Sequence, residues 1–268
     1  MFVVTGSPRS GTGYASLLFK VLTIPCTHEA VYKPRAALDD VCKWFDETHI
    51  KGDSSFLAWA FFGVNPRPVT VLHQLRDPWK VIDSLAYRND LLPVRAPADP
   101  GKDSFRRAIR AYAPSVFEHR CDVCRAAEMW VVWNELIEDA AHTHDLEIYR
   151  YRLEDVSVPL IATLLDKLDV YREEEEIQNA ISSVPRNVNA GKQLNFGLKI
   201  TNPDILAAIQ KAKPGIDPII RTAIKTDTPR TPAQLAEKLP ADLLGRVNEL
   251  AERYGYPQTQ LSNQKESS

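Results

Sequence analysis

One stretch, FVVTGSPRSGTGYASLL at residues 2–18, decides the fold. Its first four residues are β-branched or aromatic, a composition that is typical of a buried parallel strand. Residues 6–13 then form a turn with three glycines, and residues 14–21 have the composition of a helix. A strand, a glycine-rich turn and a helix N-terminus together bind anions, because the first N–H groups of the helix and the positive end of its dipole face the turn.

The spacing from Gly6 to Gly11 is that of the nucleotide-binding P-loop, G-x-x-x-x-G-K-[ST]. Thr12 stands where the P-loop has its lysine, and Gly13 stands where it has the hydroxyl that binds Mg²⁺. The usual chemistry of ATP and GTP depends on both of these groups. The positive side chain lies inside the loop instead, at Arg9. The alternative to an anion-binding loop is a glycine-rich strand–helix turn that binds no ligand.

A second parallel strand is expected at residues 69–75, where it leads into Arg76-Asp77-Pro78. Asp77 is expected to cap the following helix, with Pro78 at its first position. Ligands of an open α/β sheet bind beyond the carboxyl ends of the strands. We therefore expect Arg9 and Arg76 to lie at the same edge of the sheet.

The loop G-x-x-R-S-G-T and the segment at residues 75–84 together resemble two motifs of the sulfotransferases that use 3′-phosphoadenosine 5′-phosphosulfate (PAPS). The first resembles the loop that binds the 5′-phosphosulfate. The second resembles the 3′-phosphate site, where an arginine at a strand end and a serine eight residues later bind the phosphate, and Arg76 and Ser84 match these positions. A third segment, residues 151–156, resembles a structural stretch of the family, with Glu154 or Asp155 orienting nearby groups.

The resemblance implies an α/β fold, a P-loop NTPase-like parallel sheet flanked by helices, with a helical C-terminal part that closes over the nucleotide. It implies no metal, and Arg9 would follow the leaving oxygen of the donor. Arg186 and Lys192 are further candidates for nucleotide contacts. The residues expected to bind the donor are Pro8, Arg9, Ser10, Gly11, Thr12, Gly13, Arg76 and Ser84.

Transfer to an acceptor also needs a general base beside the sulfuryl group. Members of the family supply a Glu or a His from the segment after the first helix, and Thr27-His28-Glu29 lies in that segment. We expect Glu29 to be the base, with His28 beside it as orienter or alternate base. His73 is a third candidate, which we expect to pack between strand and helix instead. The alternative for His28 and Glu29 is a surface pair in a loop.

The function that the resemblance implies is in-line transfer of a sulfuryl group from PAPS to a hydroxyl or amine of a small-molecule, carbohydrate or lipid acceptor. The nucleotide product would be 3′-phosphoadenosine 5′-phosphate (PAP). One rival is a P-loop small-molecule or nucleoside kinase, which would need ATP and Mg²⁺. The other is a non-catalytic nucleotide-binding protein of the same fold.

The composition is that of an ordinary globular protein, with 268 residues, 44% of them hydrophobic and 25% charged. We expect a single domain at residues 1–258 and a disordered tail at 259–268. A formal net charge of −2 gives no general attraction to nucleic acid or membranes. There is no apolar run of 18 residues and no leader-like N-terminus, so we expect a cytoplasmic enzyme without a membrane span.

The remaining patterns predict the flanking elements. A turn is expected at 51–53, an exposed loop at 92–103 and a third strand at 146–151; helices are expected at 35–49, 104–112, 126–140, 158–168, 173–184, from 202 onward and at 241–254. Cys121 and Cys124 form a C-x-x-C pair that follows His119. A metal or redox pair is one interpretation, but a structural zinc site needs four ligands, which favours reduced thiols.

Overall fold

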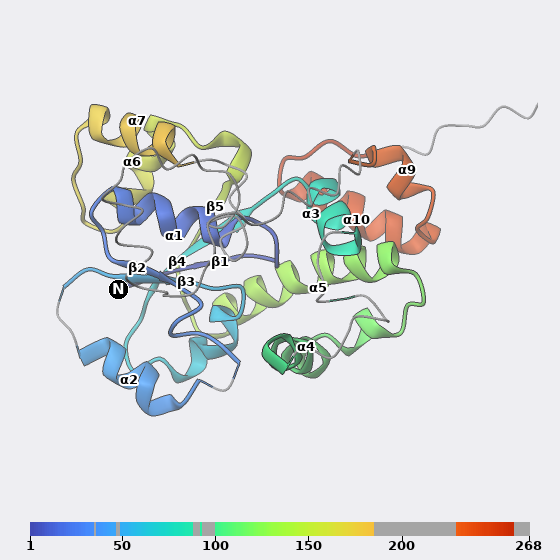
Figure 1. Ribbon diagram of the computed structural model, residues 1–268, viewed down its shortest axis with the longest axis horizontal. Helices are drawn as coiled ribbons and strands as arrows, with labels where there is room; N and C mark the ends of the chain where they lie inside the picture. Colours follow the sequence, from blue (N-terminus) through green and yellow to red (C-terminus); the bar gives the residue numbers. More distant parts are fainter. Residues whose placement is uncertain (35, 47–48, 88–91, 93–99, 185–228, 260–268) are drawn as a thin grey trace, which may run out of the picture.

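The computed structural model describes residues 1–34, 36–46, 49–87, 92, 100–184 and 229–259. Its centre is a five-stranded sheet, parallel throughout, with the strand order β2-β3-β1-β4-β5 (Figure 1). The strands are β1 (Phe2–Thr5), β2 (Cys26–His28), β3 (Gly52–Ser54), β4 (Thr70–Leu75) and β5 (Ile148–Arg152). The expected α/β class, with helices flanking a parallel sheet, is confirmed.

Strand β1 lies at the middle of the sheet and pairs with β3 on one side and β4 on the other. Phe2 is in register with Gly52 of β3 and with Thr70 of β4. The chain runs from β1 to β2 and β3 on one side, then crosses to β4 and β5 on the other. The strand order therefore reverses at β1. The carboxyl ends of strands at such a reversal are where open α/β sheets bind ligands.

Helices cover both faces of the sheet and enclose two hydrophobic cores (Figure 1). One face is covered by α1 (Thr12–Val21), α6 (Val158–Asp166) and α7 (Glu174–Ser183). The larger core on the other face is formed with α2 (Leu38–Asp46), the 3₁₀ helix η1 (Ala58–Val64), α3 (Pro78–Tyr87), α4 (Pro100–Tyr112), η2 (Pro114–Phe117), α5 (Asp122–Thr143), α9 (Pro232–Ala236) and α10 (Ala241–Arg253). A last 3₁₀ turn, η3 (Leu153–Asp155), follows β5.

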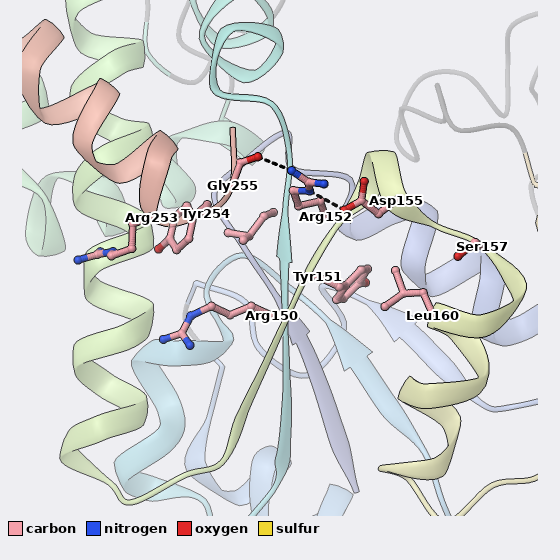
Figure 2. Close-up of a pocket in the computed structure, with 10 residues that line it drawn as sticks. Arg150, Tyr151, Arg152, Asp155, Ser157, Leu160, Arg253, Tyr254 and Gly255 are labelled. Atoms are coloured by element: carbon pink, nitrogen blue, oxygen red, sulfur yellow. Dashed lines mark hydrogen bonds and ion pairs between the residues drawn. The ribbon is translucent and has the colours of Figure 1, made fainter. Parts of the chain in front are cut away.

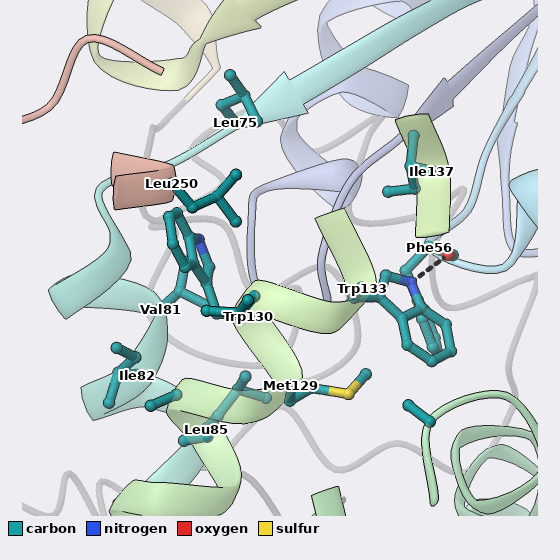
Figure 3. Packing of buried hydrophobic residues seen from close by; sticks show 14 of the residues in the cluster. Phe56, Leu75, Val81, Ile82, Leu85, Met129, Trp130, Trp133, Ile137 and Leu250 are labelled. Carbon is teal, nitrogen blue, oxygen red and sulfur yellow. Dashed lines mark hydrogen bonds between the residues drawn. The ribbon is translucent and has the colours of Figure 1, made fainter. Parts of the chain in front are cut away.

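Helix α5 supplies the two largest fully buried side chains of the larger core (Figure 3). Trp130 and Trp133 are at most 1% exposed, so these tryptophans are core residues. Trp130 lies beside Val81 of α3 and Leu250 of α10. The indole N–H of Trp133 donates to the carbonyl of Phe56 at 2.7 Å. Burying aromatic side chains of this size contributes strongly to stability, and α5 thereby fixes α3 and its preceding strand.

The turn expected at residues 51–53 is wrong, because residues 52–54 form strand β3 between β1 and β2. Its first residue is a glycine for a packing reason. A Cβ on Gly52 would lie 2.3 Å from the Phe2 ring. The expected exposed loop at 92–103 is also partly wrong, since Leu92 is buried and α4 begins at Pro100.

The four cysteines are free thiols, of which Cys26 and Cys124 are buried. Among the described residues, no helix combines the length and the apolar character that crossing a bilayer requires. Arg186, Lys192, the helices expected between 202 and 228, and residues 260–268 of the expected tail lie outside the described part of the chain.

Candidate functional site

The glycine-rich loop joins β1 to α1 as expected, and its backbone is bent sharply. Arg9 and Gly11 both have left-handed backbones, with φ of 76° and 109°. A Cβ on Gly6 would lie 2.3 Å from the carbonyl oxygen of Gln74 and 2.5 Å from Ser10 Oγ. The loop therefore requires glycine at position 6, where the backbone closely approaches strand β4.

Within the described part of the chain, the N-cap residue of α1 makes no side-chain cap at the N-terminus of this helix. Its N-cap residue, Gly11, offers no side chain, and the first turn contains no acidic residue. The N-terminus of α3 differs, because Asp77 Oδ1 accepts hydrogen bonds from the backbone N–H groups of Trp79 (2.9 Å) and Lys80 (3.3 Å). The expected Asp77 cap is thus confirmed. At α1, the first-turn N–H groups and the positive end of the dipole suit an external anion.

The structure brings the two sequence motifs together. Arg76 Nη1 donates to the carbonyl oxygen of Arg9 at 3.1 Å, and Arg9 Nε donates to Ser84 Oγ at 2.8 Å. Two guanidinium groups and a hydroxyl, from a loop, a strand end and the second turn of α3, therefore meet beside the N-terminus of α1. The contact between Arg9 and Ser84 was not expected, since the sequence motifs assign these residues to opposite ends of the nucleotide.

A buried glutamine supports the loop from beneath. Gln74 of β4 is fully buried, and its Nε2 donates to the carbonyl oxygen of Ser10 at 3.1 Å. Its Oε1 accepts from the hydroxyl of Tyr151 at 2.8 Å. Sequence reasoning missed Gln74. The only signal was an uncharged amide side chain next to the last residue of β4.

Not every expected donor of the loop is available to a ligand. The N–H of Ser10 donates to the carbonyl of Ser7 at 3.0 Å, so it belongs to the loop's own turn. The Ser10 hydroxyl is buried and has no hydrogen-bond partner in the described part of the chain. The N–H groups of Gly11, Thr12 and Gly13 remain suited to an anion, so the loop fits a phosphate group through the helix N-terminus.

The end of β2 brings His28 to the same helix N-terminus. His28 Nε2 lies 3.4 Å from Thr12 Oγ1 at the start of α1. Both His28 and Glu29 are partly buried, so they are not simply a surface pair. Glu29 has a left-handed backbone with φ of 51°, and its N–H donates to the carbonyl of Ser54 at 3.1 Å.

Burial shifts the proton affinity of both residues. It raises the pKa of Glu29 to about 7, and the negative charge of Asp53 adds to this rise. Burial lowers the pKa of His28, against the opposing effect of Asp53 and with a smaller contribution from Lys20. Each side chain can therefore accept a proton near neutral pH, Glu29 as a carboxylate and His28 as a neutral imidazole.

The third candidate base, His73, lies inside the protein. It is fully buried in β4, and its Nε2 lies 2.9 Å from Asn134 Oδ1 of α5. Burial lowers the pKa of this imidazole to about 4. The expectation that His73 packs between strand and helix is confirmed.

Two acidic residues organise the strand ends around the site. Glu154 of η3 accepts from the backbone N–H of Asp77 at 3.2 Å and from the hydroxyl of Tyr256 at 3.0 Å, and it is one of the two residues, Glu154 or Asp155, expected to orient nearby groups. Asp53, at the end of β3, is fully buried and accepts hydrogen bonds from the segment that carries Glu29. Sequence reasoning missed Asp53, because its segment reads as a turn.

A shallow pocket of about 560 Å³ opens at the carboxyl end of β5, between η3 and α10 (Figure 2). Three arginines line it, and all three already have partners. Arg150 and Arg253 share the carboxylate of Glu138, at 2.7 and 3.0 Å, while Arg152 pairs with Asp155 at 2.5 Å. This pocket is distinct from the site at the α1 N-terminus.

Comparisons with protein-family models, with curated proteins and with solved structures gave no match to this chain. The site combines a helix N-terminus whose N-cap residue has no side chain, two arginines and a serine that are linked by hydrogen bonds through Arg9, and a candidate proton acceptor, His28, in contact range of Thr12. Glu29, the second candidate, follows His28 directly.

Proposed function

We propose that this chain is a PAPS-dependent sulfotransferase with a P-loop NTPase-like fold. The observation that carries the proposal is the meeting of Arg9, Arg76 and Ser84 at the N-terminus of α1. The loop at the N-terminus of α1 and the pair Arg76 and Ser84 are two anion-binding elements beside the strand at which the strand order reverses. They suit a ligand that carries a phosphate group at each of two ends. PAPS has this character, since it carries a 5′-phosphosulfate and a 3′-phosphate.

Each element has a role in holding the donor. The N–H groups of Gly11, Thr12 and Gly13, with the α1 dipole, would bind the 5′-phosphate. Pro8 and Ser10 shape the loop, because Pro8 is buried and the Ser10 N–H closes an internal turn. Arg76 and Ser84 would bind the 3′-phosphate through a charged fork and a hydroxyl.

Arg9 would provide the main electrostatic contribution to the reaction. The donor supplies the sulfuryl group, and negative charge grows on the oxygen that leaves. A guanidinium already held by its hydrogen bond to Ser84 would stabilise such a charge with little reorganisation. The contact of Arg9 with Ser84 also suggests that one side chain couples the two phosphate sites.

Glu29 would take the proton from the acceptor's hydroxyl or amine. A pKa of about 7 is suited to this role, since a general base is most effective when its pKa is near the working pH. His28 lies beside it, in contact range of Thr12, and would orient the acceptor or serve as the alternate base.

Calorimetric titration of the full chain with PAP and with ATP·Mg²⁺ tests the proposal. We expect PAP to bind and ATP·Mg²⁺ to bind at least tenfold more weakly, and we expect Arg76→Ala to remove most of the PAP affinity. Lys80→Ala is the matched control, because Lys80 is a neighbouring cation whose side chain is 56% exposed. Tight binding of ATP·Mg²⁺ with no response to PAP would favour the kinase.

Turnover separates an enzyme from a nucleotide-binding protein. ³⁵S-labelled PAPS would be incubated with a panel of phenols, sugars, lipids and amines, and the label in the acceptors and the release of PAP would be measured. We expect label in at least one acceptor class, and loss of that label in Glu29→Gln. PAP binding without any transfer would favour the non-catalytic rival.

A further inference from the structure

Asp53 holds one continuous segment of the chain through three hydrogen bonds. Its Oδ1 accepts from the hydroxyl of Thr27 at 2.5 Å and from the N–H of Ala30 at 3.2 Å, and its Oδ2 accepts from the N–H of Tyr32 at 3.1 Å. The side chain is fully buried. A buried carboxylate that receives several hydrogen bonds is costly to replace, because each donor would lose its partner.

The segment held in this way carries both candidate bases. Thr27 precedes His28 and Glu29, and Ala30 and Tyr32 follow them, so the contacts of Asp53 bracket the two residues. Between these contacts, Glu29 has a left-handed backbone with φ of 51°. That conformation is costly for a residue with a Cβ and persists only where the surroundings enforce it.

The end of β3 also connects this segment to the anion-binding loop. Next to Asp53, the hydroxyl of Ser54 donates to the carbonyl of Thr12 at 2.7 Å, and the carbonyl of Ser54 accepts from the N–H of Glu29 at 3.1 Å. The first turn of α1 is thus bonded to Ser54, and the segment with the candidate bases is bonded to both Ser54 and its neighbour Asp53.

We propose that Asp53 is a positioning residue of this site, which folds the segment from Thr27 to Tyr32 so that His28 and Glu29 stand at the N-terminus of α1. This inference rests on the proposed sulfotransferase function for its role in catalysis. The geometry on which it stands does not depend on that function.

The charge of Asp53 acts on the same residues. The negative charge of Asp53 raises the pKa of Cys26, His28, Glu29 and Tyr32. The positive charge of Lys20, in α1, lowers the pKa of Cys26 and His28. Without the charge of Asp53, burial would be the main cause that raises the pKa of Glu29. The pKa of Glu29 would fall, and that of His28 would fall as well.

The test is a ¹³C NMR titration of the Glu29 carboxyl in the full chain, with its resonance assigned from Glu29→Gln. In Asp53→Asn we expect Glu29 to titrate at lower pH than in the wild-type protein. We also expect sulfuryl transfer at pH 8 to fall by about 10²-fold, the scale of a misplaced catalytic group, with PAP affinity unchanged within twofold. Thr27→Val keeps the charge, so it should reduce turnover less and leave the titration of Glu29 in place.

Ser16→Ala is the matched control. It removes a buried hydroxyl that donates to the carbonyl of Cys26 in β2, but it changes no charge and no contact of the segment from Thr27 to Tyr32. The inference is overturned if Glu29 titrates in Asp53→Asn as in the wild-type protein, or if Ser16→Ala loses as much turnover. Failure of the proposed function would look different, since the wild-type chain would then transfer no sulfuryl group while the titration of Glu29 still reports on Asp53.

Discussion

The pH dependence of turnover offers the sharpest test of the catalytic base. With a pKa of about 7, Glu29 is about one-tenth ionised at pH 6, half ionised at pH 7 and nine-tenths ionised at pH 8. If its carboxylate is the base, kcat/KM should rise about tenfold between pH 6 and pH 8. If the base is His28, whose pKa is lowered below its usual value, most of the rise should be complete by pH 7.

The assay is the initial rate of PAP release at donor concentrations well below KM, because kcat/KM then reports the ionisation of the free enzyme. Glu29→Gln should lower the rate by about 10²-fold or more and abolish the inflection near pH 7, while PAP binds as before. His28→Ala should lower the rate by a smaller factor and keep the inflection of the pH profile near pH 7. A Glu29→Gln enzyme with near-normal turnover and an unchanged profile would refute the assignment.

Three further substitutions probe the donor site and its scaffold. Arg76→Ala should weaken the binding of PAP by about 1.5–3 kcal/mol and leave the binding of adenosine 5′-phosphosulfate nearly unchanged, as measured by calorimetry. An equal loss of affinity for both nucleotides would show that Arg76 does not bind the 3′-phosphate. Arg9→Ala should reduce turnover by about 10²-fold, with partial recovery in Arg9→Lys, and a change in donor KM alone would make Arg9 a binding contact only. Asp77→Ala should lower the free energy of unfolding in urea by about 1 kcal/mol through the lost α3 cap, whereas no change would show that the cap contributes little.

The fold could be predicted where strands are long or strongly apolar. The runs that became β1, β4 and β5 have β-branched and aromatic side chains, and sequence reasoning found all three. Strands β2 and β3 have only three residues each, Cys-Thr-His and Gly-Asp-Ser, which lack any strand-like composition. Their pairing is imposed by the sheet, with β3 against β1 and β2 against β3, so propensity gave no indication of them.

The candidate site was predictable to the extent that its residues follow strands in sequence. Arg9 and Arg76 come after β1 and β4, and the reversal of strand order at β1 brings them together. Gln74 and Asp53 were missed, since their roles depend on which backbone groups fold against them. Asp53 is a buried hydrogen-bond acceptor only because β3 ends beside the turn that carries Glu29.

The carboxylate of Glu154 has a consequence for random mutagenesis. One of its oxygens holds the backbone beside Arg76, and the other holds the hydroxyl of Tyr256, which follows the last helix. A screen for variants that have lost nucleotide affinity should therefore recover changes at Tyr256, far along the chain from any residue that would touch the ligand. Substitutions after α10 would mimic defects in the binding site, and trimming the chain before that tyrosine would loosen the strand end that presents Arg76.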